Sequence, residues 1–137
     1  MVKDFYHEHV KRALEKDGWE ITNDPYILES GKIKYQVDLG AEKLFGASKG
    51  KEKILVEVKS FVGTSDVNEF HRAVGQYVDY FVVLDEVEPD RVLFLAVPVF
   101  TWETFFQEKA IQKALKFINA KVLIYNPITE KIEQWIK

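Results

Sequence analysis

The spacing of apolar residues at the start of the chain is that of a helix. Tyr6, Val10 and Leu14 recur at intervals that place them on one helical face, and Gly18 follows as a residue suited to a helix C-terminus. The pattern predicts a helix over residues 4–16.

Most of the following segments read as strands. In residues 33–39, apolar and polar side chains alternate with the period of two that is typical of a half-buried strand. In residues 53–60 the apolar side chains fall on both faces, which favours a central strand. The other predicted strands are residues 19–22, 26–28, 92–97, 121–125 and 131–135.

Two longer segments are predicted to be helical. Residues 66–86 have Ser65 or Thr64 as a helix N-cap, although residues 81–84 could equally form a strand. Residues 101–120 read as one or two helices. The buried apolar face of the helix over residues 66–86 is predicted to consist of Val67, Phe70, Val74, Tyr77, Val78 and Phe81.

Together these elements predict a mixed α/β domain with a central sheet and helices packed against it. A length of 137 residues suits one domain, over residues 1–137, and 47% hydrophobic residues supply its core. No apolar run is long enough for a signal peptide or a membrane span. We therefore expect no membrane partner. Because the chain has no cysteine, we also expect a protein of the reducing cytoplasm.

Three charged residues lie where the pattern predicts burial. Glu57 and Lys59 are two positions apart in the most apolar strand, and Asp38 ends the strand before it. A buried ion costs several kcal/mol unless a partner, a metal or a substrate compensates it, and two converging carboxylates repel unless a cation lies between them. Oxygen ligands suit Mg²⁺ or Mn²⁺. Lys59 would then hold the attacking water or stabilise charge on a phosphate, and the alternative is a structural ion pair.

These residues resemble the signature of a known nuclease superfamily. Val37-Asp38, a spacer of eighteen residues and Glu57-Val58-Lys59 are similar to the PD-(D/E)XK motif of restriction-endonuclease-like nucleases, with Val37 in place of the proline. The resemblance implies a restriction-endonuclease-like core with a mixed sheet flanked by helices. It also implies that Asp38 and Glu57 are catalytic metal ligands with Lys59 beside them, and that the backbone carbonyl of Val58 is a further ligand.

Two further matches extend this resemblance. Gln76 and Tyr80 fit the Q-x-x-x-Y motif of the RecB-like branch, and they lie one turn apart on a helix face. Glu8 resembles the additional acidic metal ligand of that branch and of Holliday-junction resolvases. A carboxylate in a first helical turn is, however, ordinarily a solvated residue that compensates the helix dipole.

Nearly the whole chain also resembles the XisH family, the fdxN-element excision controlling factors of cyanobacteria. The resemblance implies a role in excising a DNA element, alongside a site-specific recombinase and a small partner, XisI. It leaves open whether the chain cuts DNA, and a homodimer is also left open. The matching segments are Phe5-Tyr6-His7-Glu8, Lys16-Asp17-Gly18-Trp19, Asp38-Leu39-Gly40-Ala41-Glu42-Lys43, Val56-Glu57-Val58-Lys59-Ser60-Phe61, Glu69-Phe70-His71 and Glu88-Pro89-Asp90-Arg91.

Two hypotheses therefore stand. The first is a Mg²⁺- or Mn²⁺-dependent DNA endonuclease. The second is a non-catalytic accessory factor that binds DNA, the recombinase or a XisI-like partner, which the net charge of −3 favours because nucleic-acid binders usually carry a basic excess. The three histidines lack the spacing of a zinc motif. A cluster of lysines is interpreted as a solvated face rather than a phosphate site: Lys32, Lys34, Lys49, Lys51 and Lys53.

Overall fold

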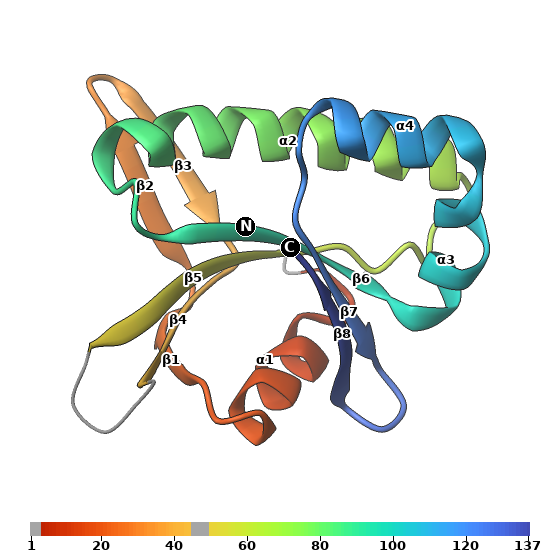
Figure 1. The fold of residues 1–137 in the computed structure, drawn as a ribbon, viewed down its shortest axis with the longest axis horizontal. Helices are drawn as coiled ribbons and strands as arrows, with labels where there is room; N and C mark the ends of the chain where they lie inside the picture. The colour runs from red at the N-terminus through yellow and green to blue at the C-terminus, as the bar shows by residue number, and fades with distance from the viewer. Residues whose placement is uncertain (1–3, 45–49) are drawn as a thin grey trace.

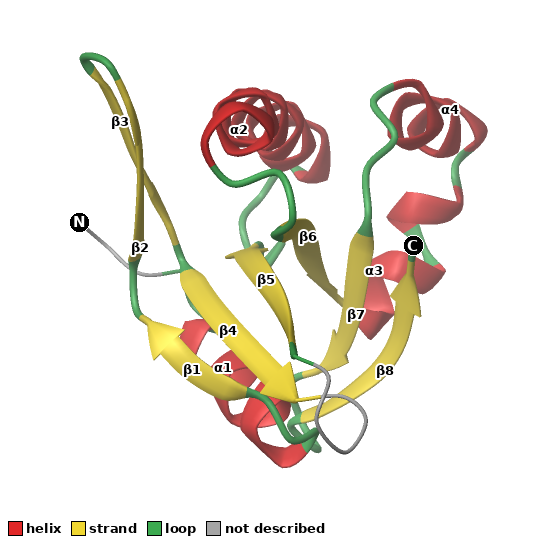
Figure 2. Cartoon of the chain, turned by 60° about the vertical axis from the view of Figure 1, so that its left-hand side comes forward, coloured by secondary structure: helices red, strands yellow, loops and turns green. Residues whose placement is uncertain are grey.

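The computed structural model describes residues 4–44 and 50–137 and has the expected mixed α/β architecture (Figure 1). A six-stranded sheet carries helices on both faces, and a separate two-stranded hairpin stands beside it (Figure 2). The elements are α1 (His7–Lys16), β1 (Glu20–Asn23), β2 (Tyr26–Ser30), β3 (Ile33–Val37), β4 (Leu39–Leu44), β5 (Lys51–Val58), α2 (Asp66–Val87), β6 (Val92–Pro98), α3 (Val99–Glu103), the 3₁₀ turn η1 (Phe105–Gln107), α4 (Lys109–Phe117), β7 (Val122–Asn126) and β8 (Lys131–Ile136).

The strand order in the main sheet is β1-β4-β5-β6-β7-β8. β5, β6 and β7 run parallel to one another, while β1, β4 and β8 pair antiparallel with their neighbours. The parallel strands are joined by crossovers through α2 and through α3 and α4, as parallel pairing requires. β5 therefore lies inside the sheet, as its apolar pattern predicts.

Each face of the sheet has its own hydrophobic core. Strand residues on one side, such as Leu55 and Leu95, pack with α2, η1, α4 and the hairpin. Their neighbours in sequence, such as Val56 and Phe94, point to the other side and pack with α1. This alternation follows from the period of two along a strand, and it assigns Glu57 to the α2 side together with Leu55.

The predicted strand over residues 33–39 is in fact two strands. β3 ends at Val37 and pairs with β2 in the hairpin, whereas β4 begins at Leu39 and pairs with β5 in the main sheet. Alternation alone missed this break because both strands continue the same pattern. Asp38 therefore lies at the junction between the two sheets.

The long helix α2 begins as predicted, since the Ser65 hydroxyl accepts a hydrogen bond from the backbone N–H of Asn68. The strand alternative for residues 81–84 is wrong, and so is half of the predicted buried face. Val67, Val78 and Phe81 are exposed. The core side of the helix is formed by Phe70, Ala73, Tyr77, Tyr80, Val83 and Leu84.

The segment predicted as one or two helices consists of α3, η1 and α4. Within the described residues, no helix combines the length and the apolar character needed to cross a bilayer.

Candidate metal centre

A cavity of about 560 Å³ opens at the carboxyl end of β5, between the hairpin and α2. In open α/β sheets, the carboxyl ends of the strands are where ligands ordinarily bind. The cavity brings together five of the residues selected from the sequence, together with Val58. It is lined by Asp4, Lys34, Tyr35, Gln36, Asp38, Glu57, Val58, Lys59, Arg72, Gln76 and Tyr80.

The pairing of β4 with β5 sets Asp38 beside Glu57. Leu39 is the register partner of Val56, so the residue before β4 meets the end of β5. Two hydrogen bonds cross the junction: the Asp38 N–H donates to Glu57 Oε1 at 3.3 Å, and the Val58 N–H donates to Asp38 Oδ2 at 2.8 Å. Both carboxylates are thereby fixed by backbone groups.

Lys59 follows directly after β5 and is as buried as the two acids, with 7% of its surface exposed. Its Nζ lies 3.8 Å from Glu57 Oε2, which is a loose ion pair. The backbone of this segment is held from elsewhere in the fold. The Tyr125 hydroxyl donates to the Lys59 carbonyl at 2.9 Å, and the Tyr6 N–H donates to the Ser60 hydroxyl at 2.9 Å.

The two buried carboxylates are not compensated by the cations around them. Burial, and then the charge of Asp38, raise the pKa of Glu57 to about 8 even though Lys59 opposes the shift. Burial also raises the pKa of Asp38, against a lowering by the Val58 hydrogen bond and by His7 and Lys59. The protein alone therefore supplies too little positive charge to keep both groups ionised at neutral pH.

Asp4 is a third acidic residue of the cavity, and the sequence analysis did not select it. Burial raises the pKa of Asp4 to about 6, and Lys59, Glu69 and Asp38 all contribute to its electrostatic environment. Only its position just before α1, beside a segment that packs against Ser60, brings it here. No spacing rule connects it with Asp38 or Glu57.

Gln76 and Tyr80 face the cavity from α2, as their spacing of four residues allows. The Oε1 atom of Gln76 is buried and has no hydrogen-bond partner within the described part of the chain. Burial, followed by the charges of Glu57 and Asp38, raises the pKa of the Tyr80 hydroxyl. Both polar groups are therefore directed at the space around the two carboxylates.

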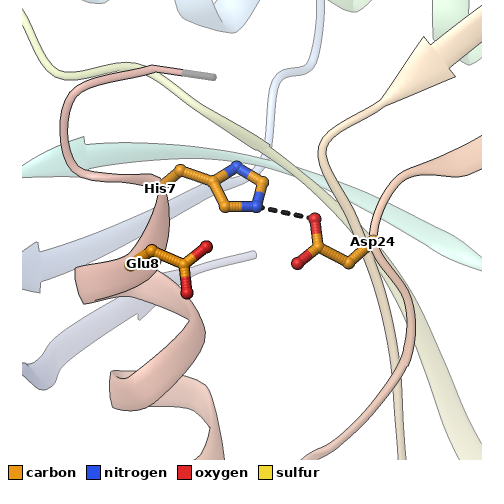
Figure 3. Close-up of side chains that lie close together, drawn as sticks. All are labelled: His7, Glu8 and Asp24. Atoms are coloured by element: carbon orange, nitrogen blue, oxygen red, sulfur yellow. Dashed lines mark hydrogen bonds and ion pairs between the residues drawn. The ribbon is translucent and has the colours of Figure 1, made fainter. Parts of the chain in front are cut away.

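Glu8 is not among the residues that line the cavity. It lies in a neighbouring cluster with His7 and Asp24, whose ligand atoms are within 4.8 Å of one another (Figure 3). His7 Nε2 and Asp24 Oδ1 are 2.7 Å apart, and Lys11 Nζ donates to Asp24 Oδ2 at 3.0 Å. Asp4, four residues before Glu8 and outside α1, lines the cavity instead.

His7 connects the two clusters. His7 is 2% exposed, and its Nδ1 lies 3.9 Å from Asp38 Oδ1 without a hydrogen-bond partner among the described residues.

The lysines that the sequence places close together do not form one group in the structure. Lys34 lines the cavity, Lys51 pairs with Glu42 at 3.1 Å, and Lys49 lies outside the described residues.

The fold and the cavity together define a mixed α/β protein with two buried carboxylates and one lysine at the end of a central strand. The chain belongs to the XisH family: the family model described as XisH protein matches residues 1–133.

Two solved structures are similar over nearly their full length. An XisH family protein from Nostoc punctiforme PCC 73102 is 44% identical, with a TM-score of 0.88 over 98% of this chain and 100% of that chain. An fdxN element excision controlling factor protein from Anabaena variabilis is 43% identical, with a TM-score of 0.87 over 96% of this chain and 98% of that chain. No curated protein matches.

Proposed function

We propose that this chain is a metal-dependent DNA endonuclease that acts in the excision of a DNA element. The observation that carries the proposal is the meeting of Asp38, Glu57 and Lys59 in one cavity at the junction of β4 and β5. This is the arrangement expected from the PD-(D/E)XK resemblance. The role in excision is suggested by the name of the Anabaena variabilis relative.

The donor set suits Mg²⁺ or Mn²⁺. Asp38 and Glu57 offer carboxylate oxygens, and Val58 lines the same cavity. The raised pKa of Glu57, about 8, fits a site in which a divalent cation replaces the proton. A cation held there supplies Lewis-acid polarisation of a phosphodiester and offsets its negative charge.

The surrounding residues have separate roles in this proposal. Lys59 keeps its ammonium in the cavity, where it stabilises negative charge on the phosphate or holds the attacking water. Gln76 offers an unpaired Oε1 as a hydrogen-bond acceptor, and the Tyr80 hydroxyl stays protonated because its pKa is raised. They act as supports that orient the water and the strand.

A second candidate function is a non-catalytic accessory factor that binds DNA, a recombinase or a XisI-like partner. The word "controlling" in the name of the Anabaena variabilis relative favours it, and so does the net charge of −3. In this case the cavity binds without cutting.

The two candidates are distinguished by incubating the purified protein with supercoiled, linear and branched DNA in Mg²⁺, in Mn²⁺ or in EDTA. We expect cleavage that requires the metal and falls at least about 100-fold in Glu57→Gln, since even groups that only support a ligand change activity by 10- to 100-fold. Glu8→Gln is the matched control, because Glu8 lies outside the cavity, and it should keep its activity. Absence of cleavage of all three DNA forms with either metal would leave the accessory role.

A further inference from the structure

Two cations, Lys34 and Arg72, stand on the walls of the cavity above its buried carboxylates. Lys34 comes from β3 of the hairpin and Arg72 from the first half of α2. Both side chains are exposed, in contrast to Lys59 beneath them. We propose that Lys34 and Arg72 bind the phosphate backbone of a nucleic-acid strand that crosses the cavity between the hairpin and α2. This inference rests on the proposed function, because it names how that same site holds its substrate.

Neither cation is engaged within the protein. Among the residues that the structure describes, Lys34 and Arg72 form no ion pair and no side-chain hydrogen bond, although Glu29 is the register partner of Lys34 in the hairpin. Two other arginines differ in this respect: Arg12 pairs with Glu130 at 2.6 Å, and Arg91 pairs with Glu88 at 2.6 Å. The charges of Lys34 and Arg72 therefore remain available to a ligand at the cavity that both residues line.

The walls that carry these cations are held in place. Near its tip, the hairpin is bound to the end of α2, since the Ser30 hydroxyl donates to Glu86 Oε1 at 3.2 Å. Near its base, the Tyr26 hydroxyl donates to Glu88 Oε1 at 2.7 Å. These contacts involve β2 and the C-terminal part of α2. They do not involve Lys34, Arg72 or Gln76, which line the cavity.

Polar side chains accompany each cation in the lining of the cavity. On α2, Arg72, Gln76 and Tyr80 follow one another at intervals of four residues and share a helix face. On β3, Lys34 and Gln36 share the exposed strand face, Tyr35 between them packs toward α2, and all three line the cavity. The arrangement fits an extended anion with charges beyond its reacting centre, which is the chemistry of a polynucleotide backbone.

One aromatic contact joins the two walls. The rings of Tyr35 and Tyr80 lie 5.4 Å apart between centroids at 58°, and both residues line the cavity. Aromatic side chains beside phosphate-binding cations are typical of proteins that bind single strands, because bases can stack on them, and Tyr35 is the less buried of this pair. Single-stranded and duplex DNA share the phosphate chemistry, so the experiment compares the two.

The test measures binding in EDTA, where a metal-dependent nuclease does not cut. Fluorescence anisotropy of a labelled oligonucleotide, single-stranded or annealed, is recorded between about 50 and 200 mM salt. We expect Lys34→Ala and Arg72→Ala each to reduce the slope of log K against log salt by about 0.7 on a single strand or about 0.9 on a duplex, the value of one phosphate contact. The probe that shows the change identifies the form of DNA held.

Lys113→Ala on α4 and Arg12→Ala on α1 are the matched controls, since both residues are exposed and neither lines the cavity. Their slopes should equal that of the wild type. Three outcomes would contradict the proposed phosphate contacts of Lys34 and Arg72. They are unchanged slopes in Lys34→Ala and Arg72→Ala, equal changes of slope in all four variants, and no binding of either probe by the wild type. Cutting with unchanged slopes would leave the nuclease proposal standing, whereas altered slopes without cutting would support a DNA-binding accessory factor.

Discussion

Two carboxylate clusters lie side by side in this protein, and their surroundings shift the carboxyl pKa values in opposite directions. Around Asp24, hydrogen bonds from Lys11 and His7 outweigh the effect of burial, and the pKa of the Asp24 carboxyl is lowered. In the cavity, burial outweighs Lys59 at both carboxyls and raises the pKa values of Asp38 and Glu57, and the charge of Asp38 adds to the shift at Glu57. In the first cluster, Asp24 is stabilised by hydrogen bonds to Lys11 and His7. The second has a deficit of positive charge, which agrees with the proposed binding of a divalent cation.

The largest expected contrast between the clusters is in the pH dependence of stability. Glu57 in the folded state keeps its proton from the ordinary pKa of 4.5 up to about 8, while the unfolded chain releases it. Folding stability without metal should therefore fall as the pH rises through this window, by up to about 5 kcal/mol for a shift of this size. Urea unfolding in EDTA at a series of pH values measures it.

Glu57→Gln is the control for this prediction, because it has no proton to lose. Burial raises the pKa of Asp4 only to about 6, so the interval between pH 6 and 8 reports on the Asp38–Glu57 pair more than on Asp4. If a Glu57→Gln variant loses stability over this interval as steeply as the wild type, the pH dependence of stability does not come from Glu57. Asp24 has the opposite sign, because its lowered pKa gives stability that is lost only as the pH falls.

The next contrast is in the response to metal. Mn²⁺ should raise the unfolding temperature of the wild type, since a ligand that binds only the native state adds about 2.7 kcal/mol at 100 times its dissociation constant. Asp38→Asn and Glu57→Gln should lose this gain, and Asp24→Asn should keep it. Differential scanning fluorimetry at pH 8 measures the shift. Equal Mn²⁺ stabilisation of all four proteins would place the ion elsewhere.

The smallest contrast comes from one substitution made in both clusters. At pH 8 in EDTA, Asp38→Asn should raise stability by roughly 0.5–2 kcal/mol, because it removes repulsion while its amide oxygen can still accept from the Val58 N–H. Asp24→Asn should lower stability by about 1–2 kcal/mol, because it removes a charged partner of Lys11 and His7. Chemical denaturation of both variants measures whether the free energy of unfolding rises in Asp38→Asn and falls in Asp24→Asn. A loss of about 3–5 kcal/mol in Asp38→Asn would instead identify a structural ion pair in the cavity.

The sequence predicts the cavity better than it predicts the surfaces around it. Charges inside the apolar strand β5 have few explanations, so Glu57 and Lys59 could be selected from the chain alone. The exposed apolar residues of α2 could not be separated from its core residues. Val78 and Phe81 are exposed and Tyr80 is buried, although hydrophobicity alone suggests otherwise. A helix that is apolar on most of its circumference does not reveal which side faces the sheet.

Residues that reach the site from other segments were missed for a different reason. Asp4 and His7 lie near Asp38 only because α1 packs beneath the sheet, and Arg72 faces the cavity only because of the rotation of α2. None of these positions carries a local pattern that connects it with β5. Glu8 was selected by its resemblance to a known ligand, yet the helix directs it to the Asp24 cluster.

The hydrogen bond from Tyr125 to the Lys59 carbonyl also bears on the order in which the protein is made. The donor lies 66 residues after its acceptor, so a ribosome releases the segment of Glu57 and Lys59 well before β7 exists. Contacts of such separation form late, because loop closure must precede them. A chain still under synthesis therefore has the charged residues but not the backbone geometry that holds them. The support that Tyr125 gives to the Lys59 backbone is therefore among the later contacts of the site to form.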